Sequence, residues 1–200
     1  EHKTGVMKTL TLDYDEQSCS ESALAGPDQC LSLHDKPGVI WVDIEGINDI
    51  QTLAKIGLCF GLHPLVMEDI LNTDQRPKIE DYGDYLYIVL RMLSHEKENG
   101  EINSEQVSLI LGGNFVLSIQ EGAKGDVFDP VRNRIRNGKG QIRKLGADYL
   151  AYSLIDAVVD NYFIILEKTG ERIELLEETL ISAPGPETLH QIHNLKREMI

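Results

Sequence analysis

The sequence is poor in cysteine, in basic residues and in long uncharged stretches. Its three cysteines, Cys19, Cys30 and Cys59, form no Cys-x-x-Cys pair, and this sparse, odd number argues against a disulfide framework. We therefore expect a reducing, cytoplasmic compartment. The longest stretch without a charged residue is residues 106–120, which glycines interrupt, whereas a bilayer-spanning helix needs about 20 apolar residues. No membrane span and no targeting leader are predicted within these 200 residues.

Basic residues are outnumbered, since 19 Lys and Arg stand against 33 Asp and Glu and the formal net charge is −14. An acidic surface repels nucleic-acid phosphates and anionic lipid, and it concentrates cations. The run of six cations from Arg132 to Lys144 contains no aromatic residue, so it does not indicate a nucleic-acid site. We interpret this run as a solvated face or as a partner for the acids of a neighbouring subunit.

Hydrophobic runs predict a sheet in the first part of the chain. Strands are predicted over residues 6–14, 39–44, 85–93, 106–111 and 115–119. The last two are joined through Gly112-Gly113-Asn114, which is typical of a tight antiparallel hairpin, and their alternation predicts one well-defined buried face. Residues 15–37 mix polar residues, glycine and proline, and are predicted to form a loop with a short helix.

Helical periodicity and capping residues predict five helices. Asn48 is expected to cap the first helix and Gly61 to end it, while His63 caps a second helix that opens with Pro64. The predicted helices cover residues 48–61, 64–72, 126–136, 147–181 and a segment from residue 187 onward.

The pattern changes after about residue 120, where strands give way to helices only. This predicts an α/β body over residues 1–146, followed by a helical extension over residues 147–200 that packs on the same domain. Pro184-Gly185-Pro186 divides the extension. The last helix reaches Ile200 without a glycine, proline or cap, so we expect the natural chain to continue.

Two groups of carboxylates fall on predicted helices. Glu68 and Asp69 are adjacent in the second helix and are flanked by apolar residues, which makes a narrow acidic edge. The long helix is apolar enough for burial around most of its circumference, and its one polar stripe consists of Ser153, Asp156, Asp160 and Glu167. A divalent cation would compensate such carboxylates, and an edge that contacts another subunit or pairs with arginine is the alternative; the pattern leaves both open.

Other motifs carry little chemistry. His190 and His193 share one helix face but lack a third metal ligand, and Gly138-Lys139-Gly140 lacks the third glycine of a dinucleotide loop. No nucleophile elbow is present, so the chain is not predicted to be an enzyme. A soluble metal-dependent hydrolase that uses the acids to position a metal-bound water is the alternative from another class.

Six segments, in order, closely resemble the cytoplasmic domain of CorA-type magnesium transporters. They include the sequence GLHPLVMEDILN at residues 61–72 and QRPK at residues 75–78, and continue through residues 85–93, 104–111, 126–132 and 147–157. The resemblance covers roughly residues 39–200, and residues 1–38 are not distinctive. It implies an α/β/α sandwich with a central mixed β-sheet, followed by helices that lead into a stalk helix.

The resemblance also implies a function. In this family five identical subunits form a funnel, and two membrane helices carry a Gly-Met-Asn signature, which is absent here. Divalent-cation sites between subunits imply Glu68, Asp69 and Asp156 as metal ligands, with Mg²⁺ and Co²⁺ as the ions, and a further stalk acid beyond residue 200. The expected role is a cation-sensing regulatory domain at the cytoplasmic face of the cell membrane, in which bound metal favours the closed state. The cytoplasmic domain of a related zinc-efflux transporter is the nearer alternative.

Overall fold

Seven strands form one mixed sheet in the order β2-β1-β3-β7-β6-β5-β4. The computed structural model describes residues 7–23, 37–95, 102–122 and 126–198. Only β3 and β7 are parallel neighbours, and every other pair is antiparallel. The strands are β1 (Lys8–Tyr14), β2 (Cys19–Ser22), β3 (Val39–Glu45), β4 (Lys78–Asp81), β5 (Leu86–His95), β6 (Ile102–Leu111) and β7 (Phe115–Gln120).

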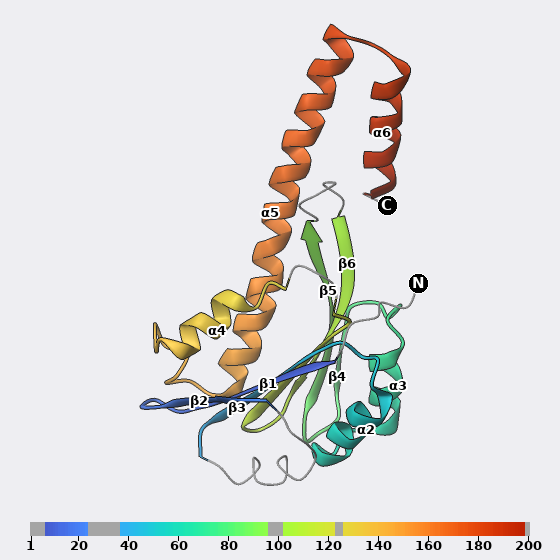
Figure 1. Ribbon diagram of the computed structural model, residues 1–200. Helices are drawn as coiled ribbons and strands as arrows, with labels where there is room; N and C mark the ends of the chain where they lie inside the picture. The colour runs from blue at the N-terminus through green and yellow to red at the C-terminus, as the bar shows by residue number, and fades with distance from the viewer. Residues whose placement is uncertain (1–6, 24–36, 96–101, 123–125, 199–200) are drawn as a thin grey trace.

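Helices cover both faces of the sheet, which confirms the predicted α/β/α class (Figure 1). Helices α2 (Ile50–Cys59) and α3 (Pro64–Leu71) bury apolar residues such as Leu53 and Val66 against one face. Helices α4 (Asp129–Arg136) and α5 (Ala147–Ser182) cover the other face. The prediction of a single buried face for the hairpin is therefore wrong, since β7 is buried along its whole length.

The helix ends follow local hydrogen bonding. His63 caps α3 as predicted, because its Nδ1 accepts from the backbone N–H of Leu65 at 3.2 Å and Pro64 occupies the first turn. Gly61 has φ of +64° just after α2, which confirms the predicted glycine stop. The cap of α2 is Asp49 rather than Asn48, since the Asp49 carboxylate accepts from the backbone N–H of Thr52 at 3.0 Å.

Two edge strands were not predicted. The segment expected to be a loop with a short helix contains β2, and β4 lies between predicted elements; residues 24–36 of that segment lie outside the described residues. Both strands are four residues long and mostly polar, so they lack the apolar alternation that marks a strand. Pairing with β1 and β5 creates them.

Helix α5 runs beyond the sheet and forms an arm with α6 (Pro186–Glu198), which returns alongside it (Figure 1). The predicted break at Pro184-Gly185-Pro186 is confirmed. Among the described helices, α5 alone has the length and hydropathy of a membrane span. Its first half packs on the sheet through Leu150, Leu154 and Val158, and 33% of its most apolar 18-residue window is buried. The division of the chain at residue 146 stays a prediction.

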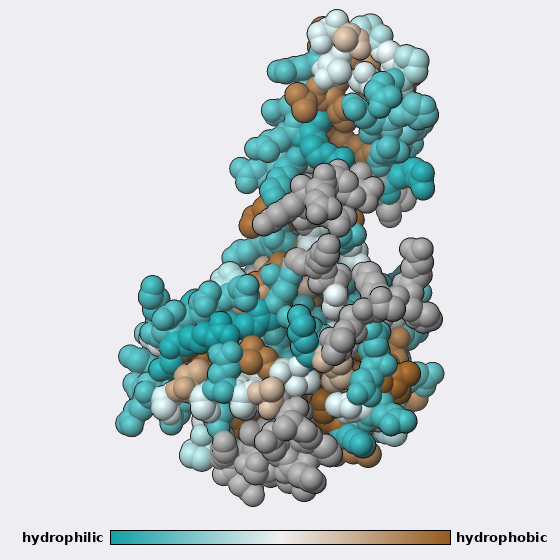
Figure 2. All heavy atoms as spheres, viewed as in Figure 1, coloured by the Kyte–Doolittle hydropathy of each residue, from teal (hydrophilic) through white to brown (hydrophobic). Residues whose placement is uncertain are grey.

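The expectation that the apolar circumference of the long helix is buried is wrong. Val159, Phe163 and Leu166 are exposed, because α5 meets the sheet on one side only. Figure 2 shows hydrophobic side chains between hydrophilic ones on the arm.

Candidate metal sites

Helix α3 presents the predicted acids at the surface. Val66 and Ile70 face the core, and this orientation leaves Glu68 exposed and Asp69 partly buried. We call Glu68 and Asp69 the α3 carboxylates.

Asp69 is held in place by its neighbours. Its Oδ2 lies 2.5 Å from the Lys78 ammonium, and its Oδ1 accepts from the Gln75 side-chain amide at 3.0 Å. Lys78 also contacts Glu80 at 2.9 Å. Partial desolvation lowers the pKa of Lys78, but the hydrogen bonds to Asp69 and Glu80 outweigh this effect, so the pKa lies above its usual range. A metal ion at Asp69 would therefore compete with one well-bound ammonium group.

Asp156 lies on α5, across the sheet from α3 (Figure 1). It is partly buried and lines a cleft of about 740 Å³ between α4 and α5, together with Asp160, Arg134 and Lys168. The structure brings Glu68 and Asp69 together, but Asp156 belongs to the opposite layer of the same chain. A metal ion bound by all three carboxylates therefore requires two copies of the chain.

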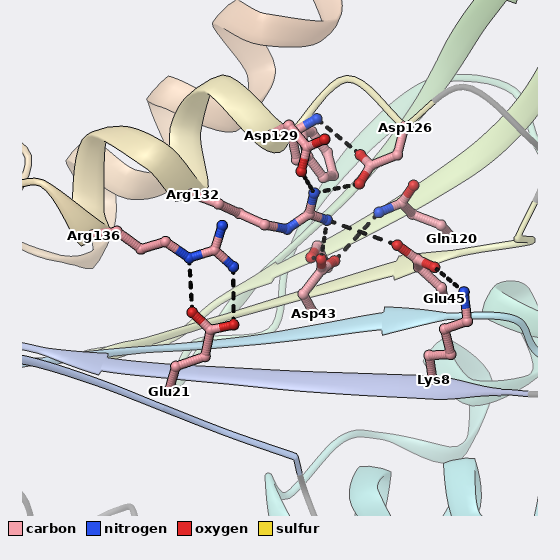
Figure 3. A network of polar contacts seen from close by, with 11 residues as sticks. Lys8, Glu21, Asp43, Glu45, Gln120, Asp126, Asp129, Arg132 and Arg136 are labelled. Atoms are coloured by element: carbon pink, nitrogen blue, oxygen red, sulfur yellow. Dashed lines mark hydrogen bonds and ion pairs between the residues drawn. The ribbon is translucent and has the colours of Figure 1, made fainter.

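A second group of carboxylates surrounds Arg132 of α4 and was missed from the sequence (Figure 3). Asp43, in the middle of β3, is 3% exposed and accepts from the Ser118 hydroxyl at 2.5 Å. The guanidinium of Arg132 contacts the carboxylates of Asp43 and Asp126, and it lies 2.9 Å from Asp129 and 4.0 Å from Glu45. We call Asp43, Glu45, Asp126, Asp129 and Arg132 the Arg132 cluster.

Burial shapes the electrostatics of this cluster. It raises the pKa of the Asp43 carboxyl, while the charge of Arg132 and the hydrogen bond from Ser118 act against that rise. Burial also disfavours the charged form of Arg132, but the carboxylates of Asp43 and Asp126 raise its pKa, so the guanidinium stays protonated. Arg132 also lies over the Trp41 ring, 5.6 Å from its centroid.

The donor chemistry of both groups suits a hard divalent cation, but their surroundings differ. Carboxylate oxygens of Asp43, Glu45 and Asp126 lie within 4.8 Å of one another, close enough to share an ion. The guanidinium of Arg132 already supplies the positive charge between them. The Arg132 cluster therefore joins α4 to the sheet through a guanidinium that lies among its acids, whereas the α3 carboxylates lie at the surface.

The sequence carried a signal for the Arg132 cluster. Asp43 interrupts an apolar strand, and a charged residue at such a position needs a buried partner. The interpretation of the basic run as a solvated face or a subunit contact is wrong for Arg132 and Arg136. Arg132 pairs within the chain, and Arg136 binds Glu21 of β2 through two hydrogen bonds of 2.7 and 2.9 Å.

Residues 36–200 match the family described as CorA-like Mg²⁺ transporter protein. The cobalt/magnesium transport protein CorA of Thermotoga maritima is 47% identical over 189 residues, which cover 94% of this chain and 54% of that protein. The chain thus spans about half the length of this relative.

Solved structures share the fold. The soluble domain of CorA from Methanocaldococcus jannaschii superposes with a TM-score of 0.71 at 17% identity, covering 96% of this chain and 70% of that one. The cytoplasmic domain of ZntB from Vibrio parahaemolyticus gives 0.66 at 12% identity, covering 98% and 72%. The family match over most of the chain and the 47% identity decide the family: the chain belongs to the CorA-like Mg²⁺ transporter proteins.

Proposed function

We propose that this chain is the cytoplasmic, divalent-cation-sensing domain of a Mg²⁺ and Co²⁺ transporter. The ion would lie between adjacent copies, held by Glu68 and Asp69 of one copy and Asp156 of the next, in a homopentamer anchored to the membrane by helices outside this chain. Membership of a transporter family supports this role over that of an enzyme.

The observation that carries the proposal is the separation of the three acids by the sheet. Acids on opposite layers of one chain can meet across a contact between copies. There they repel each other, and a dication between them replaces the repulsion with attraction. Bound metal would therefore favour the assembled, closed arrangement, and metal loss would loosen it.

The donor set also bears on which ion is bound. Mg²⁺ is held by few carboxylates and keeps several waters, so the site can be weak enough to respond to an abundant cation. Zinc prefers histidine and cysteine ligands, which Glu68, Asp69 and Asp156 do not provide. A zinc-efflux role is the second candidate, and the fold shared with the ZntB domain is the observation that favours it.

The test combines sedimentation with thermal unfolding of the chain in increasing MgCl₂ or CoCl₂. We expect both ions to promote association and to raise the unfolding midpoint, because binding at a hundredfold excess over Kd adds about 2.7 kcal/mol. The variant Glu68→Gln, Asp69→Asn, Asp156→Asn should lose both effects. A matched variant that removes three exposed acids elsewhere, Asp74→Asn, Asp84→Asn, Glu178→Gln, should keep them.

Equal responses in the two variants would contradict the site. At the level of the whole transporter, the sensing role would be contradicted if the first variant still stopped transport at high Mg²⁺. A stronger and equally site-dependent response to ZnCl₂ would favour the zinc-efflux role instead.

A further inference from the structure

An exposed row of apolar side chains runs along α5. Tyr152, Val159, Leu166, Ile173 and Leu180 follow one another at intervals of seven residues, so each is offset by about 20° from the one before and the row winds slowly along one side of the helix. Phe163 lies on the same face between two of them. We call these six residues the α5 seam. Their exposed fractions are 58% for Tyr152, 41% for Val159, 67% for Phe163, 63% for Leu166, 36% for Ile173 and 40% for Leu180.

The neighbouring face of α5 already has a partner. Helix α6 packs against α5, and Thr169 of α5 and Leu195 of α6 are buried. At 100° per residue, Thr169 lies roughly 80° around the helix from Val159. By the same count Ile173 and Leu180 lie only about 40° and 20° from Thr169, so the second packing face is the part of the α5 seam from Tyr152 to Leu166, where each seam side chain is at least 41% exposed.

A row of acids borders the seam on its other side. Asp160, Glu167 and Glu174 are exposed, and each directly follows a seam residue, so they also recur at intervals of seven. In helix pairs the residues beside an apolar seam choose the partner by charge. An acidic border selects a partner helix with basic flanks.

Gly170 lies in the middle of the seam. No heavy atom outside its immediate chain neighbourhood lies within 4 Å of the position its Cβ would take, and its φ is not in the left-handed region. A glycine inside a helix costs about 1 kcal/mol relative to alanine. Neither the backbone nor the described contacts require this glycine, but it would let the backbone of a second helix approach closely.

We propose that the α5 seam docks a basic amphipathic helix whose apolar residues recur every three to four positions. A second copy of α5 is a poor occupant, because its acidic border would face the same acids in an antiparallel pair and gain no opposite charge in a parallel one. The acids also disfavour an anionic lipid surface. This inference does not use the α3 carboxylates, but Asp156 of the proposed metal site lies on the same side of α5, about 20° around the helix from Phe163.

The test measures binding of a fluorescent synthetic peptide to the 200-residue chain by anisotropy. The peptide is a 28-residue helix with leucine at the two core positions of each heptad and lysine at the flanking ones. We expect Phe163→Glu with Leu166→Glu to weaken binding at least tenfold, because exposed aromatic and aliphatic anchors dominate such contacts. The matched variant Leu58→Glu with Ile79→Glu adds the same charge at apolar sites that are 81% and 69% exposed, and should bind as the wild type does.

Charge is tested separately. Glu167→Gln with Glu174→Gln should weaken binding several-fold and reduce its salt dependence, and a peptide with glutamate in place of lysine should not bind. Thermal unfolding verifies that each variant is folded, and Phe163→Ala with Leu166→Ala replaces the glutamate variant if that one unfolds.

Three results would overturn the proposal. Peptide binding by both glutamate variants that is as strong as that of the wild type would mean adsorption by net charge alone. A wild-type dimer that the seam variant dissociates, and that blocks the peptide, would make a second copy the occupant. Seam-dependent binding to phosphatidylserine vesicles without peptide binding would make it a membrane surface.

Discussion

The Arg132 cluster and the α3 carboxylates are both groups of acids beside one cation, but they differ in burial. Asp43 and Arg132 are 3% and 4% exposed, and their charges compensate each other inside the protein. Asp69 and Lys78 keep about a quarter of their side chains exposed, and Glu68 beside them is open to solvent.

This difference separates a structural role from a binding role. In the interior a cation cannot exchange, because removing it would leave a buried carboxylate without compensation. At the surface water screens the acids, and a hydrated dication can come and go. The presence of three nearby carboxylates alone therefore does not identify a metal site.

The largest effect on stability is expected when the buried pair of Asp43 and Arg132 is broken. Arg132→Met keeps the aliphatic stem but leaves Asp43 without its cation, so the free energy of unfolding should fall by about 3–5 kcal/mol in urea titrations. The control Arg136→Met removes an exposed pair with Glu21 and should cost under about 1 kcal/mol.

The double variant Arg132→Met, Asp43→Asn tests the physical reason. It removes the buried charge, and the amide can still bond to Ser118 and Gln120, so much of the lost stability should return. Equal stabilities of the single and double variants would show that the loss comes from the other contacts of the guanidinium, with Asp126, Asp129 and Trp41, rather than from the uncompensated charge of Asp43.

A smaller effect, on the affinity for Mg²⁺, tests whether the α3 carboxylates bind the ion. Lys78→Met removes the ammonium that competes for Asp69, so the apparent affinity for Mg²⁺ should rise about fivefold, equivalent to roughly 1 kcal/mol. The Mg²⁺ dependence of the unfolding midpoint measures it. Lys139→Met, at an exposed position after α4, should leave the affinity unchanged, and weaker binding in the Lys78 variant would make the lysine part of the site.

The smallest expected effect is the pH dependence of the stability that the exposed Glu21–Arg136 pair contributes, next to the Arg132 cluster. The hydrogen bonds from Arg136 lower the pKa of Glu21, so the stability that this carboxylate contributes is present above its unfolded-state pKa and is lost as the pH falls through the lower folded-state pKa. Glu21→Gln should cost under about 0.5 kcal/mol at pH 7, because the pair is exposed. Unfolding titrations at pH 7 and at successively lower pH should show that difference shrink as the pH falls through the folded-state pKa; a difference that stays constant throughout would indicate a contribution from packing.

The local features with strong patterns were predictable. The apolar run of β3, the hairpin of β6 and β7, the His63-Pro64 cap and the Pro184-Gly185-Pro186 break were each read from neighbouring residues and are confirmed. The polar edge strands β2 and β4 were not, because pairing with a neighbour rather than composition makes them strands.

The sequence by itself determined the acidic charge, the family and the acids on α3, since each depends on residue identity and short-range spacing. Only the tertiary structure decided what compensates each acid. It joined Arg132 to Asp43 across 89 positions, set Asp156 on the layer opposite α3, and left one face of α5 uncovered. Burial and charge compensation depend on tertiary contacts rather than on neighbouring residues, because the sheet decides which distant segments come together.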